Sequence, residues 1–546
     1  MRRVLPFLVL LLLLWLLAGA FYGGDLGKTR DDYTWAVNDP ATGAADAVDL
    51  WRLPLFWRPA SLVLVRHLVS LTWDAPWIAN LLTALAHLSL VLVFWRWLRK
   101  LGCGAAADAS AMLFVALPIA YDVMHWPAAM PTALSAIVAI VAARLALGST
   151  GEERAARRLA GIAALAFLCC CLNEQAAACL AAVVVVPLLQ RRRSAIGVAL
   201  AIGLPCVAYV TLTMMTAPPN HRGGVGTLVD PSDWGPRAIS ALASSADQLM
   251  GERGRHLLLG GLETAWPALG AWGVALVAAA VLAGVWWSLA RRPDADGERG
   301  HWPVAAAGIA WAALGLTPFI VVRTGPIEAR HLYLPLLGVL LAASISAARI
   351  PAPALVAIGG RLLVAAAALA MAISLVGIQT TLRVRAQMDM EDAAAIVAAH
   401  PGPPGGAVIL IARQAWRQAD TGLRRYDMRF WSAWQMDHMA TAVVRHAYGR
   451  SDLFAKNRFA ANNITAADVS PEGWRVGLSK GPAWDGGRVP PVLISWDRVR
   501  ALTIDGQGRV RPVSALRFEG DGGFVQPLQV DAAAPLAPAE YTVRLR

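Results

Sequence analysis

The stretch LAGIAALAFLCCCLNEQAAACLAAVVVVPLLQRRR, residues 159–193, decides how the chain is threaded through a membrane. Two apolar segments, at about 159–172 and 175–190, meet at the polar turn LNEQ, and the second ends at three arginines. Each segment is about 15 residues long, shorter than the roughly 20 that a helix needs to cross about 30 Å of hydrocarbon. If the two segments formed one helix, every later loop would change sides and the arginine clusters would no longer share one face. We therefore predict two short crossings that meet at LNEQ.

The composition is that of a membrane protein. Of the 546 residues, 57% are hydrophobic and 16% are charged, and the mean hydropathy is +0.49. Soluble domains average about 45–50% apolar and about 25% charged residues. The net charge of +12 would suggest nucleic-acid binding in a soluble protein. Here much of the excess is arginine at the ends of apolar runs, where it sets topology and favours anionic head groups. We expect membrane lipids, and no nucleic acid, as partners.

The cysteines show no metal-binding pattern. All of them fall in or beside apolar segments, and none has metal-ligand spacing with a histidine. We interpret them as small apolar residues in helix packing. They are Cys103, Cys169, Cys170, Cys171, Cys179 and Cys206.

Outward from LNEQ, the apolar runs predict about eleven crossings with the N-terminus cytoplasmic and the C-terminus outside. Arg2 and Arg3 precede the first run and hold its start in the cytoplasm. Ala18 and Ala20 resemble a signal-peptidase site, so cleavage of this first helix is the alternative to its retention. The expected outer-face loops are residues 22–75 and 216–263. The later crossings are expected at about 78–96, 104–122, 128–147, 159–172, 175–190, 194–215, 264–289, 302–322, 332–348 and 354–378.

The character of the sequence changes after residue 380. HPGPPGGAVILIARQ is a turn-rich lead into an apolar run typical of a buried strand, and YDMRFWSAWQMDHMATAVVRHAYG has helical spacing. Short alternating runs such as PVLISW and EYTVRLR follow, separated by Gly-rich turns. We predict an α-helical polytopic membrane domain at 1–380 and a soluble α/β domain at 381–546, on the outer face.

Polar side chains from separate parts of the chain are expected at the outer ends of the crossings. Carboxylates near a bilayer are costly and usually have a task. By the topology above, the outer face gathers Asp31 and Asp32 in DDYTWAVN, Arg58 in LFWRPAS, Asp122, His125 and Trp126 in ALPIAYDVMHWP, Glu174 in LNEQ, and Arg323, Arg330 and His331 in RTGPIEARHLYLP.

Each of these residues has an ordinary explanation when it is taken alone. An aspartate pair after a membrane helix is commonly part of a solvated loop. Glu174 can cap the helix that follows it, and Arg330 can anchor at the interface while its stem snorkels. His87, seven residues after Asn80, is more often a hydrogen-bonded packing residue than a ligand. The convergence of so many groups on one face favours a joint function.

The chemistry that suits this set is transfer from an anionic, lipid-bound donor. A carboxylate can take a proton from an acceptor hydroxyl as it attacks, and arginine can hold a phosphate leaving group with paired hydrogen bonds. No Walker motif, phosphate-cradling glycine loop or G-x-S-x-G elbow supports soluble nucleotide or serine-hydrolase chemistry.

These segments resemble, in order, the motifs of the GT-C superfamily of polytopic glycosyltransferases, in the branch of protein O-mannosyltransferases and transmembrane mannosyltransferases. DDYTWAVN resembles the acidic motif after the family's first helix, and LFWRPASLVLVRHLVSL its Tyr-Arg-Pro-Leu stretch. MLFVALPIAYDVMHW, LNEQAA and EARHLYLP resemble three further segments. The resemblance covers roughly residues 1–350 and implies sugar transfer from a polyprenyl-phosphate donor.

The resemblance also implies roles for individual residues. It implies a catalytic carboxylate at Asp31 or Asp32, a second acidic position at Asp122, Glu174 near the donor site and Arg330 on the donor phosphate. The remaining candidates are Arg58 and His331 for phosphate binding, with Trp126 and Tyr333 as further site residues. Asp122 and Glu174 would orient substrates or hold a divalent cation, Mg²⁺ or Mn²⁺; no other cofactor is expected.

The chain departs from the family pattern at several positions. Leu117 stands where the family has histidine, Asn173 where it has lysine, and the arginine expected after Trp126 is missing. These departures keep two alternatives open: a catalytically inactive scaffold in envelope assembly, and a lipid flippase or transporter. The leading hypothesis is a transferase of the bacterial inner membrane, with a glycan, lipid or protein acceptor on the periplasmic side.

Overall fold

The structure is a computed structural model, and the parts of the chain that it describes cover most of the expected crossings and much of the C-terminal domain. They are residues 58–72, 75–148, 152–191, 194–216, 229–267, 270, 302–321, 327, 329–349, 354–413, 437–450, 452–456, 468–476, 492–505, 507–520, 523–530 and 537–544.

Within these residues, seven helices are long and apolar enough to cross a membrane. They are α5 (Pro76–Lys100), α8 (Met130–Leu147), α9 (Glu152–Leu172), α12 (Ser194–Thr216), α16 (Trp302–Val321), α17 (Ala329–Ala347) and α18 (Ala354–Ala399). Shorter apolar helices stand beside them: α4 (Pro59–Leu71), α6 (Gly104–Ala116), and α10 (Glu174–Ala181) with α11 (Val185–Leu189). The chain is therefore a multi-pass membrane protein, as its composition predicts.

The expected count of eleven crossings is matched only in part. Residues 104–116 and 174–189 form helices shorter than a typical span. The first expected crossing lies outside the described residues, and so does most of the one at 264–289. The loop expected at 216–263 contains the helix α14 (Trp234–Leu249).

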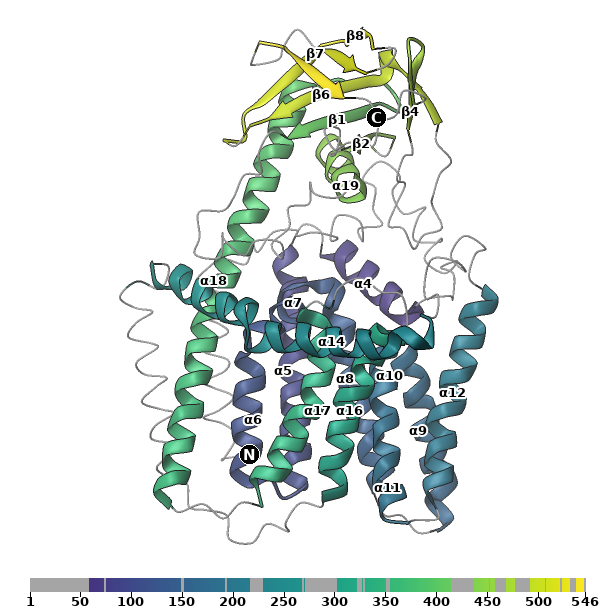
Figure 1. The fold of residues 1–546 in the computed structure, drawn as a ribbon, viewed down its shortest axis with the longest axis vertical. Coiled ribbons are helices and arrows are strands. Elements are labelled where there is room, and N and C mark those ends of the chain that lie inside the picture. Colours follow the sequence, from purple (N-terminus) through teal and green to yellow (C-terminus); the bar gives the residue numbers. More distant parts are fainter. Residues whose placement is uncertain are drawn as a thin grey trace.

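The turn at LNEQ separates two helices, as predicted, but the first, α9, is not short: it begins at Glu152 and not at about 159, and is long enough to cross. Helix α9 ends at Leu172, and the extended backbone of Asn173 starts a new helix, with its side-chain oxygen accepting a hydrogen bond from the N–H of Gln175 at 3.1 Å. An asparagine at this position satisfies one of the N–H groups that a helix start leaves without a partner. Figure 1 shows α10 and α11 returning beside α9.

Close contacts between backbones hold α16 against α17. Gly308 and Gly338 face each other where the two helices cross, and a Cβ atom on Gly338 would lie 2.7 Å from the backbone nitrogen of Ala312. Small residues at such crossings allow membrane helices to approach closely, and dispersion contacts then stabilise the pair.

Helix α18 extends well past the crossing expected at 354–378. Its 46 residues correspond to about 69 Å of helix, more than twice the thickness of the hydrocarbon core. Residues 380–399 contain no glycine or proline, and the helix ends where His400-Pro401-Gly402 begins. The helix thus passes through the expected domain boundary at 380 and carries the C-terminal sheet at its far end (Figure 1).

The C-terminal region is built on a mixed sheet with strand order β2-β1-β6-β7-β8, in which β9 also pairs with β7. Strand β1 is parallel to β2 and β6, whereas β6–β7 and β7–β8 are antiparallel. The strands are β1 (Val408–Arg413), β2 (Phe454–Lys456), β6 (Val499–Ile504), β7 (Val510–Glu519), β8 (Val525–Pro527) and β9 (Ala539–Arg544).

Both faces of this sheet are covered. Ile409 and Ile411 of β1 pack toward α19 (Asp437–Tyr448) and the end of α18, while Val408 and Leu410 face the opposite side. That side is covered by a second sheet of β3 (Val469–Ser470), β4 (Gly473–Val476) and β5 (Val492–Ser495). Two buried faces explain the continuous apolar run VILIA in β1. The strand predicted here is confirmed, and the helix is confirmed over Asp437–Tyr448; the first half of the predicted helical stretch lies outside the described residues.

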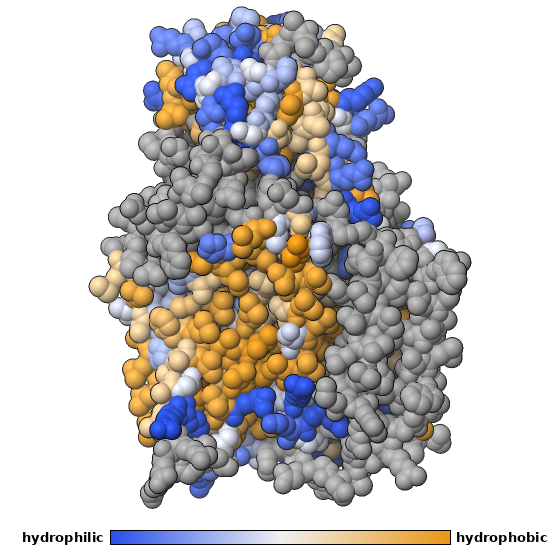
Figure 2. All heavy atoms as spheres, turned by 180° about the vertical axis from the view of Figure 1, so that it is seen from behind, coloured by the Kyte–Doolittle hydropathy of each residue, from blue (hydrophilic) through white to orange (hydrophobic). Residues whose placement is uncertain are grey.

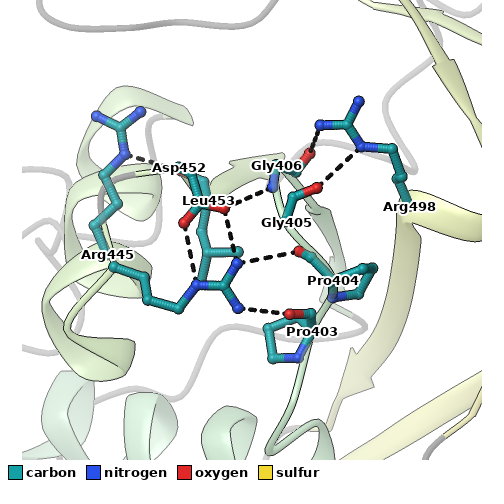
Figure 3. Close-up of polar contacts among 9 residues, drawn as sticks. Pro403, Pro404, Gly405, Gly406, Arg445, Asp452, Leu453 and Arg498 are labelled. Carbon is teal, nitrogen blue, oxygen red and sulfur yellow. Dashed lines mark hydrogen bonds and ion pairs between the residues drawn. The ribbon is translucent and has the colours of Figure 1, made fainter.

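A polar clamp fixes the turn between α18 and β1 (Figure 3). Arg498 donates hydrogen bonds to the carbonyls of Gly405 and Gly406, and Arg450 donates to the carbonyls of Pro403 and Pro404. The carboxylate of Asp452 accepts from Arg450 and from the N–H of Gly406 at 2.7 Å. These bonds lower the pKa of Asp452 to about 2.

One face of the surface has the pattern expected of a protein that crosses a bilayer. On the face drawn in Figure 2, apolar residues cover the helices, hydrophilic residues lie beneath them, and the C-terminal region at the opposite end is more polar. Basic side chains stand in the last turns of two spans: Arg99 and Lys100 in α5, and Arg144 in α8.

Candidate functional site

A two-point ion pair joins the start of α4 to the start of α10. Arg58 Nε lies 2.5 Å from one carboxylate oxygen of Glu174, and Arg58 Nη2 lies 2.6 Å from the other. Both side chains are partly exposed, at 29% and 40%. Because the planar guanidinium matches both oxygens, the pair fixes the orientation of Arg58 as well as its position.

The backbone of Arg58 is also held. Its φ of 42° is a left-handed conformation, uncommon for a residue with a side chain. The N–H of Arg58 donates to the hydroxyl of Tyr209 in α12 at 2.9 Å. A strained residue anchored through both its backbone and its side chain is typical of a functional site.

Three consecutive residues of LNEQ bind three different parts of the fold. Asn173 caps the helix through its side-chain oxygen, and its side-chain amide also donates to the hydroxyl of Thr132. Glu174 binds Arg58. The buried amide of Gln175 donates to the carbonyls of Gly315 and His331, each at 2.7 Å. The turn that sets the topology therefore also places α17 next to Glu174.

Arg330 and His331 begin α17 on the same side of the molecule. The guanidinium carbon of Arg330 lies 4.8 Å from the centre of the Trp126 ring, a cation–π arrangement. The ring of His331 is 4.6 Å from that of Phe319, and its Nε2 is 3.4 Å from Arg330 Nε. Arg58 and Arg330 both lie within electrostatic range of His331.

The described charges of this cluster leave an excess of positive charge. They are the guanidinium groups of Arg58 and Arg330 and the carboxylate of Glu174, which is paired with Arg58. Planar guanidinium donors in a half-dry site suit a phosphate group. Trp126 and Phe319 add apolar walls beside the two basic residues of α17.

The structure brings together five of the predicted site residues: Arg58, Trp126, Glu174, Arg330 and His331. Tyr333 is fully buried deeper in the bundle, where its hydroxyl lies 2.6 Å from His87 Nδ1 and its ring packs on Phe114. These contacts make Tyr333 a packing residue rather than part of the site surface.

Other predicted residues fall outside what the structure describes. Asp31, Asp32 and Arg323 lie outside the described residues. Asp122 and His125 lie in the short helix α7 (Tyr121–His125), directly before Trp126, but their side chains are outside the description. Among the described residues, no group of three or more His, Cys, Asp and Glu side chains could hold a metal ion.

Sequence reasoning missed two residues that build the cluster. Gln175 stands beside Glu174 in the quoted turn, and a buried amide in an apolar run is itself a signal, because it must find hydrogen-bond partners. Tyr209 gave no comparable signal, since a tyrosine near the end of a span is common at the membrane interface.

Comparisons with known proteins add no identification: no family model matches the chain, and no curated protein or solved structure matches it either. The resemblance to the GT-C superfamily therefore stays a prediction based on the ordered motifs, and the cluster has to be interpreted from its own chemistry.

Proposed function

We propose that this chain is a membrane glycosyltransferase that moves a sugar from a polyprenyl-phosphate donor to an acceptor on the side of the C-terminal domain. The observation that carries the proposal is the convergence of Arg58, Glu174, Arg330 and Trp126 into one cluster with two arginines at the end of the bundle. A lipid-linked phosphate reaches such a position from within the bilayer, with its head group at the depth of the span ends.

The proposal includes a GT-C-like fold of eleven crossings in a bacterial inner membrane, with the C-terminal domain in the periplasm. The basic side chains in the last turns of α5 and α8 support this orientation, because arginine and lysine are enriched in cytoplasmic loops.

In the proposed reaction an acceptor hydroxyl attacks the anomeric carbon, and the bond from that carbon to the donor phosphate oxygen breaks with inversion. Asp31 or Asp32 takes the hydroxyl proton, and polyprenyl phosphate leaves with the bonding electron pair. We assign stabilisation of the leaving phosphate to Arg330, whose guanidinium lies over the Trp126 ring at the start of α17 with His331 beside it, while Arg58 is paired with Glu174.

Asp122 and Glu174 complete the proposed site as acidic residues that orient substrates. The ion pair with Arg58 favours this orienting role for Glu174 over binding of a divalent cation, since the carboxylate is already neutralised. The acceptor is a glycan, lipid or protein, held or positioned by the C-terminal domain.

A transfer assay in membranes tests the proposal, with radiolabelled polyprenyl-phosphate sugars as donors. We expect label to move to an acceptor. Arg330→Ala should reduce transfer by about 10²-fold, the usual cost of losing a group that stabilises transition-state charge. Asp31→Asn or Asp32→Asn, whichever removes the base, should reduce transfer by about 10²-fold or more. Arg349→Ala is the matched control, because Arg349 is an exposed arginine just past the other end of α17. If no donor is consumed and all variants support a normal envelope, the inactive scaffold becomes the better hypothesis.

A further inference from the structure

Helix α14 lies across the ends of the spans rather than parallel to them (Figure 1). One face of it packs against the bundle: Ala241, Ser245 and Gln248 are buried, at the i, i+4, i+7 spacing of a helix stripe. The remaining surface of this helix divides into two chemically different faces.

The first of these faces is apolar and exposed. Ile239 and Leu242, and Met250 directly after the helix, have exposed fractions of 70%, 61% and 83%. They recur at i, i+3 and i+11 and therefore project from the same side of the helix. The second face is polar and carries Ser240, Ser244 and Asp247. An exposed apolar stripe next to a polar stripe is the pattern of a helix at a membrane surface.

Hydrogen bonds fix the depth of α14. Near its start, Arg237 donates to the carbonyls of Phe319 and Ile320 at 2.9 and 3.0 Å, in the last turn of the span α16. Near its end, the amide of Gln248 donates to the carbonyl of Ile327, shortly before the span α17 begins. Both ends of α14 therefore lie where two spans reach the edge of the hydrocarbon.

We propose that α14 is an interfacial helix, with Ile239, Leu242 and Met250 inserted into the lipid of the leaflet on the side of the C-terminal domain. The occupant of the exposed stripe is the bilayer because hydrogen bonds place both ends of α14 at the depth where the spans α16 and α17 end. A protein partner at this depth would have to displace lipid that is already there.

The same hydrogen bonds link the lipid to the candidate site. Arg237 and Gln248 hold the two ends of the segment between α16 and α17, and Arg330 follows three residues after Ile327. A helix seated in the lipid would thus fix this segment at a constant depth. The inference concerns only the placement of α14, so it does not depend on the transferase reaction.

Spin labels on the intact chain test the proposal in vesicles of phosphatidylcholine and phosphatidylglycerol. Single cysteines replace Ile239, Leu242 or Met250 on the apolar face, and Ser240 or Ser244 on the polar face as matched controls. The unsubstituted chain measures background labelling, because five native cysteines are buried and Cys206 is half-buried. Collisions with oxygen, which concentrates in lipid, are compared with collisions with a water-soluble nickel complex.

We expect the ratio of oxygen to nickel collisions to be several-fold higher at Ile239→Cys, Leu242→Cys and Met250→Cys than at Ser240→Cys and Ser244→Cys. Equal nickel access on both faces would place α14 in water and overturn the proposal. Low access to both reagents at the apolar positions would show a covering protein surface and would overturn it as well. If one label prevents accumulation of the chain, the two other apolar positions carry the same comparison.

Discussion

Arg58 and Glu174 are 116 residues apart in the chain, yet they form a two-point ion pair at 2.5 and 2.6 Å. The pair joins the segment before α4 to the turn at LNEQ, and its arginine has a left-handed backbone. The candidate site is organised around this contact, because His331 and Arg330 are placed by the residue that follows Glu174.

We expect each of Arg58→Gln and Glu174→Gln to lower the free energy of unfolding by about 1–3 kcal/mol, between the values for exposed and for buried pairs. The double variant should lose less than the sum, since the second change removes a group that the first left without its partner. Thermal unfolding in detergent measures all three variants. Glu540→Gln, in the exposed pair with Arg517, is the control and should change little. Strict additivity would contradict a coupled pair.

Gln175→Leu should weaken the site without touching a substrate. It leaves the carbonyls of Gly315 and His331 without their donor, at an expected cost of about 1–3 kcal/mol. Because His331 and Arg330 are then less firmly placed, donor KM should rise together with a fall in thermal stability. Gln387→Leu, at an exposed position of α18, serves as control. An unchanged KM would show that the cluster does not need this link.

The crossing of α16 and α17 should not tolerate a methyl group. Gly338→Ala places a Cβ atom within 3 Å of backbone atoms of α16, and we expect a loss of about 1–3 kcal/mol from overpacking. Gly203→Ala in α12 is the matched control, because its Cβ would meet nothing within 4 Å. That variant should be neutral or more stable, by about 0.5–1 kcal/mol from helix propensity. Equal unfolding midpoints for the two variants would contradict the close crossing.

The clamp at Asp452 should give the C-terminal region a specific dependence on pH. The pKa of Asp452 is about 2 in the fold and close to 3.9 in an unfolded chain, so the ionised carboxylate stabilises the fold above that range. The contribution is lost as the pH falls from about 4 to 2. Since Asp452 is partly exposed, Asp452→Asn should cost only about 0.5–1 kcal/mol at neutral pH.

Hydrogen exchange of the peptide that contains Gly406 and β1 measures this effect in the intact chain. Exchange should be faster in Asp452→Asn than in the unsubstituted chain at pH 7. In thermal unfolding, the difference between the two chains should shrink to nothing between pH 4 and pH 2. A difference that persists at pH 2 would show that the charge of Asp452 does not hold the turn.

Much of the membrane architecture could be predicted because hydropathy and arginine placement act locally. The break at Asn173 follows from a polar turn between apolar runs, and β1 from a continuous apolar strand after a Pro-Gly turn. The extension of α18 was missed because its last turns change from apolar to charged while staying helical. Helix α14 was missed because its mixed surface resembles that of a loop.

The site could be predicted as a set of residues but not as a geometry. The expected topology puts the segments of Arg58, Glu174 and Arg330 at the same ends of the crossings, which explains why these residues share a face. It does not say which arginine binds the carboxylate, because that choice depends on how α4, α10 and α17 pack. Nor does it indicate the role of Gln175, whose partners are main-chain carbonyls that every residue has.

We propose that the cluster around Arg330 binds a lipid-linked phosphate. Native mass spectrometry of the purified chain with polyprenyl phosphate and with the uncharged polyprenol tests this binding. We predict that the phosphate is retained and polyprenol is not, and that Arg330→Ala loses this retention whereas Arg349→Ala keeps it. Equal retention of the two lipids, or equal loss in the two arginine variants, would contradict the account.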